Sequence, residues 1–184
     1  MEREGRQIEY KVGFSNKKSI YHAVVAFSND IGGKVVIGVE DKPLKVVGLS
    51  EDEIEYGLKE LPMGIFDSIS PVCMPLITTE TIEGQQCLVI QVLPGQKKPY
   101  FIKGEGLPKG VYVRVGAYNM RATESLLEDM VRENQRRYWD QELTNLTVAD
   151  LDQSQLQSYY GQSWSDTQLR SDGVLLNKKI DFKF

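Results

Sequence analysis

The feature that most constrains the fold is a change of apolar period near the N-terminus. In residues 6–13 every second residue is apolar, which indicates a strand with Glu9 and Lys11 on the face opposite the apolar side chains. In residues 17–30 the apolar residues recur at helical spacing. Residues 34–41 then form a run rich in β-branched residues, typical of a strand. The pattern predicts strand, helix and strand in succession.

Local signals predict where the helices begin and end. Asn16 or Ser15 is a suitable N-cap for the first helix, and the pair at residues 32–33, Gly-Gly, suits its C-terminus. A second helix is expected from Ser50, with acidic residues in its first turn and a bend or stop near Pro62. A third helix is expected over residues 122–141. Its apolar stripe should consist of Leu126, Met130 and Val131.

Several short strands are expected between these helices. A hairpin turning near residues 41–43 should follow the first helix, and a second hairpin should turn at Glu83-Gly84. Two more short strands surround a glycine-rich connection after residue 98. We therefore predict an α+β fold, in which a mixed, mostly antiparallel sheet of about six strands packs against two or three helices. Two regions are expected: a domain over 1–138 and a C-terminal extension over 139–184, the start of a further module.

Composition narrows the class of protein. The chain has 184 residues, is 41% hydrophobic and 26% charged, and has no apolar run of the ~18 residues that suggest a membrane span. The charged N-terminus does not match a signal peptide, so a cytoplasmic location without membrane association is expected. Two cysteines and the single His22 cannot supply the four N/S ligands of a structural zinc site. We expect the two cysteines to be reduced core residues, a packing or surface role for His22, and no resident cofactor.

Charge is unevenly distributed along the chain. The formal net charge is −4, yet residues 94–121 carry six basic residues and one acidic residue. A local basic face can bind phosphates on a protein that is acidic overall, although a solvated loop with lysines is an equal alternative. Nucleotide-binding signatures are absent: the chain contains no GxxxxGK[ST], GxGxxG or GxSxG. ATP binding is therefore a weaker expectation than nucleic-acid binding.

Several motifs occur in an order shared with one known family. They are EGRQIEYK, AFSNDIGGKVVIGVED, KPYFIKG and GVYVRVGAYNMRAT, spread over about residues 4–135. Together they resemble the Schlafen/AlbA-type DNA-binding domain, formerly called the divergent AAA domain. The segment LRSDGVLLNKK resembles a degraded form of the segment that follows this domain in bacterial RecG-like helicases and transcriptional regulators. The resemblance implies a bacterial-type regulator whose domain binds DNA or RNA.

The resemblance also implies a site. In vertebrate Schlafen relatives an acidic trio cleaves RNA with a divalent metal, and the matching residues here are Glu4, Glu9 and Asp41. Carboxylate oxygens suit Mg²⁺ or Mn²⁺, so these residues are candidate metal ligands and catalytic residues of a nuclease. The relatives use a paired lobe, which a homodimer of this chain could supply.

Non-catalytic alternatives stand beside the nuclease. Glu9 and Lys11 could pair with each other or with Arg114, Asp41 could serve a turn before Pro43, and Glu4 could be disordered near the terminus. Arg114 could equally contact a phosphate.

The expected function is therefore a nucleic-acid-binding module of a transcriptional regulator, with a metal-dependent nuclease as the alternative. Tyr118 could stack on a base or cover the edge of the core. The candidate nucleic-acid-binding residues are Lys11, Lys97, Lys98, Lys103, Arg114, Tyr118 and Arg121.

Overall fold

The computed structural model describes residues 2–139 and, beyond them, only residues 154, 157–158, 161, 165, 175–176 and 179–180. The chain divides into two compact units, 1–131 and 132–184. In the second unit β11 (Leu175–Leu176) pairs with β12 (Lys179–Ile180) as antiparallel strands. The expected extension from residue 139 lies almost entirely outside the described residues, so its boundary stays a prediction.

The first unit contains a four-stranded mixed sheet in the order β1-β2-β7-β6. Its strands are β1 (Ile8–Lys11), β2 (Gly33–Ile37), β6 (Leu76–Ile82) and β7 (Gln85–Val92). The two N-terminal strands are parallel and are joined through a helix, whereas the other neighbours are antiparallel. The α+β class, the mixed and mostly antiparallel sheet and the hairpin at Glu83-Gly84 are confirmed.

The main sheet has four strands rather than about six. The other strands of the first unit form three separate pairs: β3 (Val39–Glu40) with β4 (Lys45–Val46), β5 (Ile69–Ser70) with β8 (Phe101–Ile102), and β9 (Tyr112–Val115) with β10 (Tyr118–Arg121). Gly38, at φ 107°, separates β2 from β3. Only glycine adopts such a conformation without strain, and the apolar run therefore leaves the sheet there.

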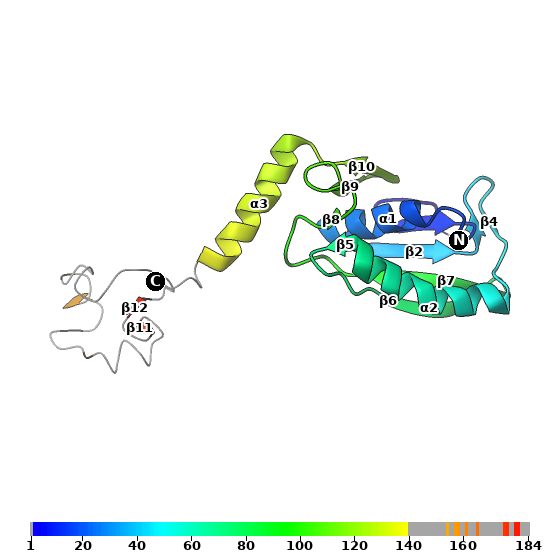
Figure 1. Ribbon diagram of the computed structural model, residues 1–184, viewed down its shortest axis with the longest axis horizontal. Coiled ribbons are helices and arrows are strands. Elements are labelled where there is room, and N and C mark those ends of the chain that lie inside the picture. Colours follow the sequence, from blue (N-terminus) through cyan, green and yellow to red (C-terminus); the bar gives the residue numbers. More distant parts are fainter. Residues whose placement is uncertain are drawn as a thin grey trace. The chain divides into compact units, whose positions relative to one another are not determined.

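Three helices complete the first part of the chain (Figure 1). The first, α1 (Lys17–Asn29), is capped by Asn16, whose side chain accepts a hydrogen bond from Ser19 N at 3.1 Å. The second, α2 (Glu51–Ser68), begins with a reciprocal capping box between Ser50 and Glu53. It continues through Pro62, so the stop offered as one alternative is wrong, whereas the bend stays a prediction. Pro62 lies on the exposed face, where water can bind the carbonyl that loses its partner.

The third helix, α3 (Glu124–Trp139), is present as predicted, but its buried face differs. Met130 packs on Val111 and Val113 together with Leu127. Leu126 and Val131, predicted to share this stripe, are 37% and 38% exposed. None of the helices in the described part of the chain is both long and apolar enough to span a membrane.

The sheet has an apolar cluster on each face. On one face α1 and α2 pack on residues that include Val35, Ile37 and Ile90. On the other face Ile8, Tyr10, Val36 and Val89 are covered by β3, β4 and the segment between them. Burial of each large aliphatic side chain contributes about 1.5–3 kcal/mol. Glu9 and Lys11 alternate with Ile8 and Tyr10 in β1 and lie on the opposite face, as predicted. This is the face on which α1 packs.

Candidate functional site

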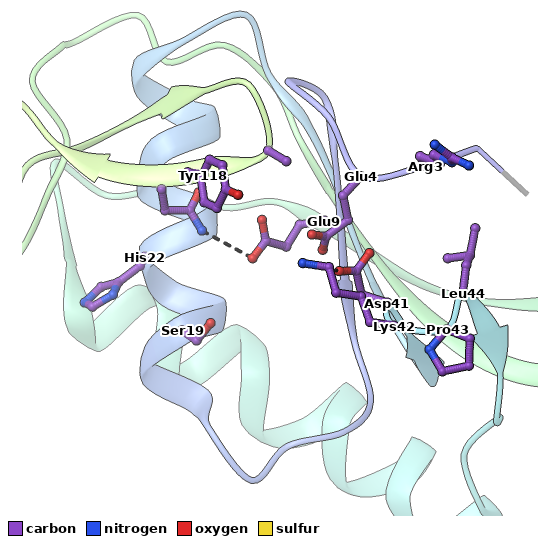
Figure 2. Close-up of a pocket in the computed structure, with 12 residues that line it drawn as sticks. Arg3, Glu4, Glu9, Ser19, His22, Asp41, Lys42, Pro43, Leu44 and Tyr118 are labelled. Atoms are coloured by element: carbon purple, nitrogen blue, oxygen red, sulfur yellow. Dashed lines mark hydrogen bonds and ion pairs between the residues drawn. The ribbon is translucent and has the colours of Figure 1, made fainter.

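The predicted acidic trio lies in one open pocket of about 820 Å³. The pocket forms where the N-terminal segment, β1, α1, the β3–β4 connection and the β9–β10 turn meet. Figure 2 shows the carboxylates of Glu4, Glu9 and Asp41 on one side and the ring of Tyr118 on another. The pocket is lined by Arg3, Glu4, Glu9, Ser19, His22, Asp41, Lys42, Pro43, Leu44, Ala117, Tyr118 and Asn119. The sequence motifs thus identified residues that the fold brings together.

Glu9 is buried and has three side-chain partners. It forms an ion pair with Lys11 at 2.5 Å and another with Arg114, and it accepts a hydrogen bond from Asn119 Nδ2 at 3.3 Å. The Arg114 side chain is fully buried and lies over the Phe27 ring at 4.9 Å. Arg114 therefore forms the ion pair with Glu9 that was one of the predicted alternatives. Its side chain has no exposed surface with which to contact a phosphate. Its prediction as a nucleic-acid-binding residue is wrong, because α1 and β1 cover it.

Glu4 and Asp41 are held less tightly than Glu9. Glu4 accepts a hydrogen bond from Tyr10 N at 2.7 Å, so its side chain is fixed on β1. Burial raises the pKa of Glu4; the hydrogen bond from Tyr10 opposes this change, while the charges of Glu9 and Asp41 add to it. Asp41 lies at the pocket edge, with Lys42 Nζ 3.8 Å from its carboxylate.

The acidic trio does not fit a divalent cation as it is arranged. Both oxygens of Glu9 are bound by neighbouring side chains, and one oxygen of Glu4 is bound by the backbone. Across the described residues, no three His, Cys, Asp or Glu side chains form a group that could hold a metal ion. A hard cation requires several oxygens at about 2.0–2.6 Å, and the ion pairs of Glu9 compete with that arrangement.

A second charged cluster, not found by sequence reasoning, surrounds Glu105 in the β8–β9 connection. Its carboxylate lies 3.1 Å from Lys18 Nζ, 3.0 Å from His22 Nε2 and 3.6 Å from Arg121 Nη2, and it accepts a hydrogen bond from the Tyr112 hydroxyl at 2.8 Å. The His22 ring stacks on Tyr112 at 4.0 Å, a packing role as expected. Glu105 is the one acidic residue within the basic segment 94–121, and this exception in the sequence was the signal that could have pointed to the cluster.

The environment of Glu105 favours its charged form. Burial alone would raise the pKa of this carboxyl group, but hydrogen bonds from Tyr112, His22 and Lys18 outweigh that effect and hold its pKa at about 2. The carboxylate is therefore ionised at neutral pH and is matched to the surrounding donors.

The predicted basic residues do not form one continuous face. Lys98 donates to Asp30 O, just past the C-terminal end of α1, at 3.2 Å. Lys103 lines a smaller pocket of about 460 Å³ with Lys18, a residue of the first turn of that helix, and donates to Phe66 O of α2 at 3.1 Å. The two ends are roughly 18 Å apart at a rise of about 1.5 Å per residue. The segment therefore reaches both ends of α1.

Of the other candidates, Tyr118 and Arg121 lie beside the larger pocket and the Glu105 cluster. Tyr118 is 69% exposed, so it does not cover the edge of the core. The side chain of Arg121 is 62% exposed. Lys11 is 22% exposed and paired with Glu9, whereas Lys97 is exposed next to Lys98. Asn29 binds the backbone of Tyr100 and Tyr112 through three hydrogen bonds.

Comparison with known proteins gives matches in sequence and in structure. An uncharacterized ATP-binding protein of Ureaplasma parvum is 32% identical over 80 residues, which are 42% of this chain and 22% of that protein. The N-terminal domain of a RecG-related ATP-dependent DNA helicase protein from Nitrosomonas europaea is 28% identical, with a TM-score of 0.50 over 65% of this chain and 85% of that one.

A protein of Corynebacterium diphtheriae, DIP2311, is 17% identical with a TM-score of 0.52 and shares the fold. The match covers 96% of this chain and 39% of the Corynebacterium one. The chain thus spans about a fifth of the Ureaplasma protein and about two fifths of the Corynebacterium protein. The family model described as Schlafen, AlbA_2 matches residues 4–123. Since this match covers well over half of the chain, the protein belongs to the Schlafen, AlbA_2 family.

Proposed function

We propose that this chain is the nucleic-acid-binding module of a transcriptional regulator and that it binds single-stranded DNA or RNA. Membership of the Schlafen, AlbA_2 family supports a role with nucleic acid. So does the likeness to the N-terminal domain of a protein named for DNA helicases. The observation that carries the proposal is the pairing of an exposed aromatic ring with exposed cations around two adjoining pockets.

The two pockets meet at the first turns of α1. His22 lines the larger pocket and contacts Glu105, while Lys18 and Glu105 line the smaller one. The exposed cations beside them are Lys18, Lys42, Lys103 and Arg121, here called the cationic rim. Cations in such positions neutralise backbone phosphates and make affinity depend on salt.

The acidic wall of the larger pocket determines how a strand would lie. Glu4 and Asp41 repel phosphates, so phosphates would follow the cationic rim while a base enters the pocket. Tyr118 would stack on that base, and carboxylate oxygens accept hydrogen bonds from base amino groups. A base that is already unstacked is available for such contacts, which favours single strands over duplexes.

Fluorescence anisotropy with labelled single-stranded and duplex oligonucleotides at several salt concentrations tests this proposal. We expect single strands to bind more tightly than duplexes, with log affinity falling linearly with log salt at about −0.7 per phosphate contact. Lys42→Ala should weaken binding and flatten the slope. Lys97→Ala and Lys98→Ala probe the other end of α1. A larger effect there would relocate the interface, and absence of binding to all nucleic acids would refute the proposal.

A second candidate function is cleavage of nucleic acid in the larger pocket, because Glu4, Glu9 and Asp41 all line it; a divalent cation could bind there only after the Glu9 ion pairs open. The test incubates RNA and single-stranded DNA with Mg²⁺ or Mn²⁺ and compares the wild type with Asp41→Asn, which leaves the buried Glu9 ion pairs intact. Cleavage that is equal in both proteins, or absent from both, would argue against this candidate. Sedimentation in the same buffers tests whether the chain forms a homodimer, which would supply the second lobe that the Schlafen relatives use.

A further inference from the structure

One carboxylate, that of Glu105, is surrounded by four donor groups from three elements, three within hydrogen-bond distance and the fourth, Arg121, in an ion pair. Lys18 and His22 come from α1, Tyr112 from β9 and Arg121 from β10, and their polar atoms lie 2.8–3.6 Å from the carboxylate. These three elements pack on one another through the core, so the backbone positions that carry the donors do not depend on Glu105. The result is a set of donors from a packed scaffold around an anion supplied by a loop.

The donor set has the chemistry of a phosphate site. Lys18 and Arg121 belong to the cationic rim, and their side chains are 67% and 62% exposed, so a ligand in solvent can reach them. Tyr112 contributes a hydroxyl from the protein interior, and His22 fixes one side of the cluster by stacking on it. Arginine and lysine both form charge-assisted hydrogen bonds with carboxylate oxygens and with phosphate oxygens. A phosphate oxygen can therefore take the place of each Glu105 oxygen.

Glu105 lies in a loop with open space beside both of its neighbours in sequence. It lies between Gly104 and Gly106, and a Cβ added at either glycine would meet nothing within 4 Å. Gly106 has φ +66°, a conformation suited to glycine. The backbone at Glu105 and Gly106 is anchored to Ile102 O at 3.0 Å. Rotation of the Glu105 side chain toward this open space would withdraw the carboxylate from the donors while the backbone anchor at Ile102 stays formed.

We propose that Lys18, His22, Tyr112 and Arg121 form a binding site for one phosphate group, and that Glu105 occupies this site as a built-in competitor. This inference rests on the proposed function for its ligand, a backbone phosphate of a single strand. Glu105 thereby limits the affinity of the cationic rim, and nucleic acid binds fully when the side chain swings away. The low pKa of Glu105 agrees with a site selective for negative charge.

The test compares wild type, Glu105→Gln and Glu105→Asp for binding of a single-stranded oligonucleotide and, separately, of inorganic phosphate. Glu105→Gln should bind the oligonucleotide about tenfold more tightly, the effect expected of one added charge-assisted contact, with a steeper salt slope. Glu105→Asp, whose shorter carboxylate competes less well, should fall between. Combining Lys18→Ala and Arg121→Ala with Glu105→Gln should abolish the gain. Glu83→Gln, which removes one negative charge at the β6–β7 turn, should change affinity less than twofold.

Each outcome separates this inference from the proposed function. If wild type binds oligonucleotides and folded Glu105→Gln binds them equally or less tightly, the phosphate site is refuted while nucleic-acid binding stands. If neither protein binds oligonucleotides but Glu105→Gln binds inorganic phosphate more tightly than wild type, the site stands and the proposed function fails. If Glu105→Gln binds neither probe, the site is refuted. A gain equalled by Glu83→Gln would also refute it, because net charge alone would then explain the effect.

Discussion

Arg114 on β9 and Glu9 on β1 form a buried ion pair across 105 residues of sequence. The same guanidinium donates to Asn119 Oδ1 at 2.7 Å and to the Gly5 carbonyl. Asn119 in turn donates to Glu9. This network ties the β9–β10 pair to the edge of the main sheet, and it thereby positions Tyr118 opposite the acidic wall of the pocket.

Arg114→Ala should therefore destabilise the protein severely. It leaves Glu9 buried with one fewer partner, and removing one member of a buried pair costs about 3–5 kcal/mol. Urea unfolding followed by circular dichroism measures this loss. Arg121→Ala is the matched control, because its exposed side chain should contribute less than about 1 kcal/mol. Equal effects of the two substitutions would show that the network does not hold the β9–β10 pair in place.

Local patterns were sufficient for many elements of this fold, although the short strands β5 and β10 were not predicted. Alternation in β1 gave the correct faces, Asn16 and Ser50 gave the helix starts, and Glu83-Gly84 gave a hairpin. These features depend on neighbours in sequence, so a single sequence contains them. The acidic trio was accessible through the family resemblance.

The packing around these elements was not predictable from the sequence. Alternation separates Glu9 from Ile8, but it leaves the Glu9–Arg114 pair as one of several alternatives and does not reveal that the Arg114 guanidinium lies over Phe27. Lys98 and Lys103 are five residues apart, and yet Lys98 donates to Asp30 O just past α1 whereas Lys103 donates to Phe66 O of α2. The Glu105 cluster joins four segments, and neither spacing nor composition predicts which donors will meet.

Two glycines with nearly the same conformation allow backbone strain and steric clash to be separated. Gly32 has φ 82° and Gly84 has φ 79°. At Gly84 an added Cβ meets nothing within 4 Å, but at Gly32 it would lie 2.7 Å from the Val92 carbonyl oxygen. Gly84→Ala should cost only the left-handed penalty of about 1–2 kcal/mol. Gly32→Ala should cost about 1–3 kcal/mol more, through overpacking, as measured by urea unfolding. Similar losses for both would contradict the close approach at Gly32.

Tyr118 offers a test of base stacking that is independent of folding. Its ring is 69% exposed, so Tyr118→Ala should leave thermal stability unchanged. The same substitution should weaken single-strand binding by about 1–3 kcal/mol, the usual contribution of one stacked base. Tyr118→Phe retains the ring and should bind like wild type in anisotropy titrations. If Tyr118→Phe loses as much affinity as Tyr118→Ala, the hydroxyl group rather than the ring makes the contact.

The low pKa of Glu105 predicts a specific dependence of stability on pH. Its pKa is about 2 in the folded protein against an ordinary value of 4.5, so the unfolded chain binds the proton more readily than the folded one. The stabilisation supplied by the Glu105 charge is therefore complete above about pH 5, and it is lost as the pH falls from 4.5 towards 2. Urea unfolding of wild type and Glu105→Gln between pH 3 and pH 7 measures it as a difference in free energy. That difference should be constant at the upper end and shrink in acid, whereas the difference between wild type and Glu83→Gln should show no such loss. A wild-type advantage over Glu105→Gln that persists unchanged to pH 3 would show that the donors hold the Glu105 side chain by shape rather than by charge.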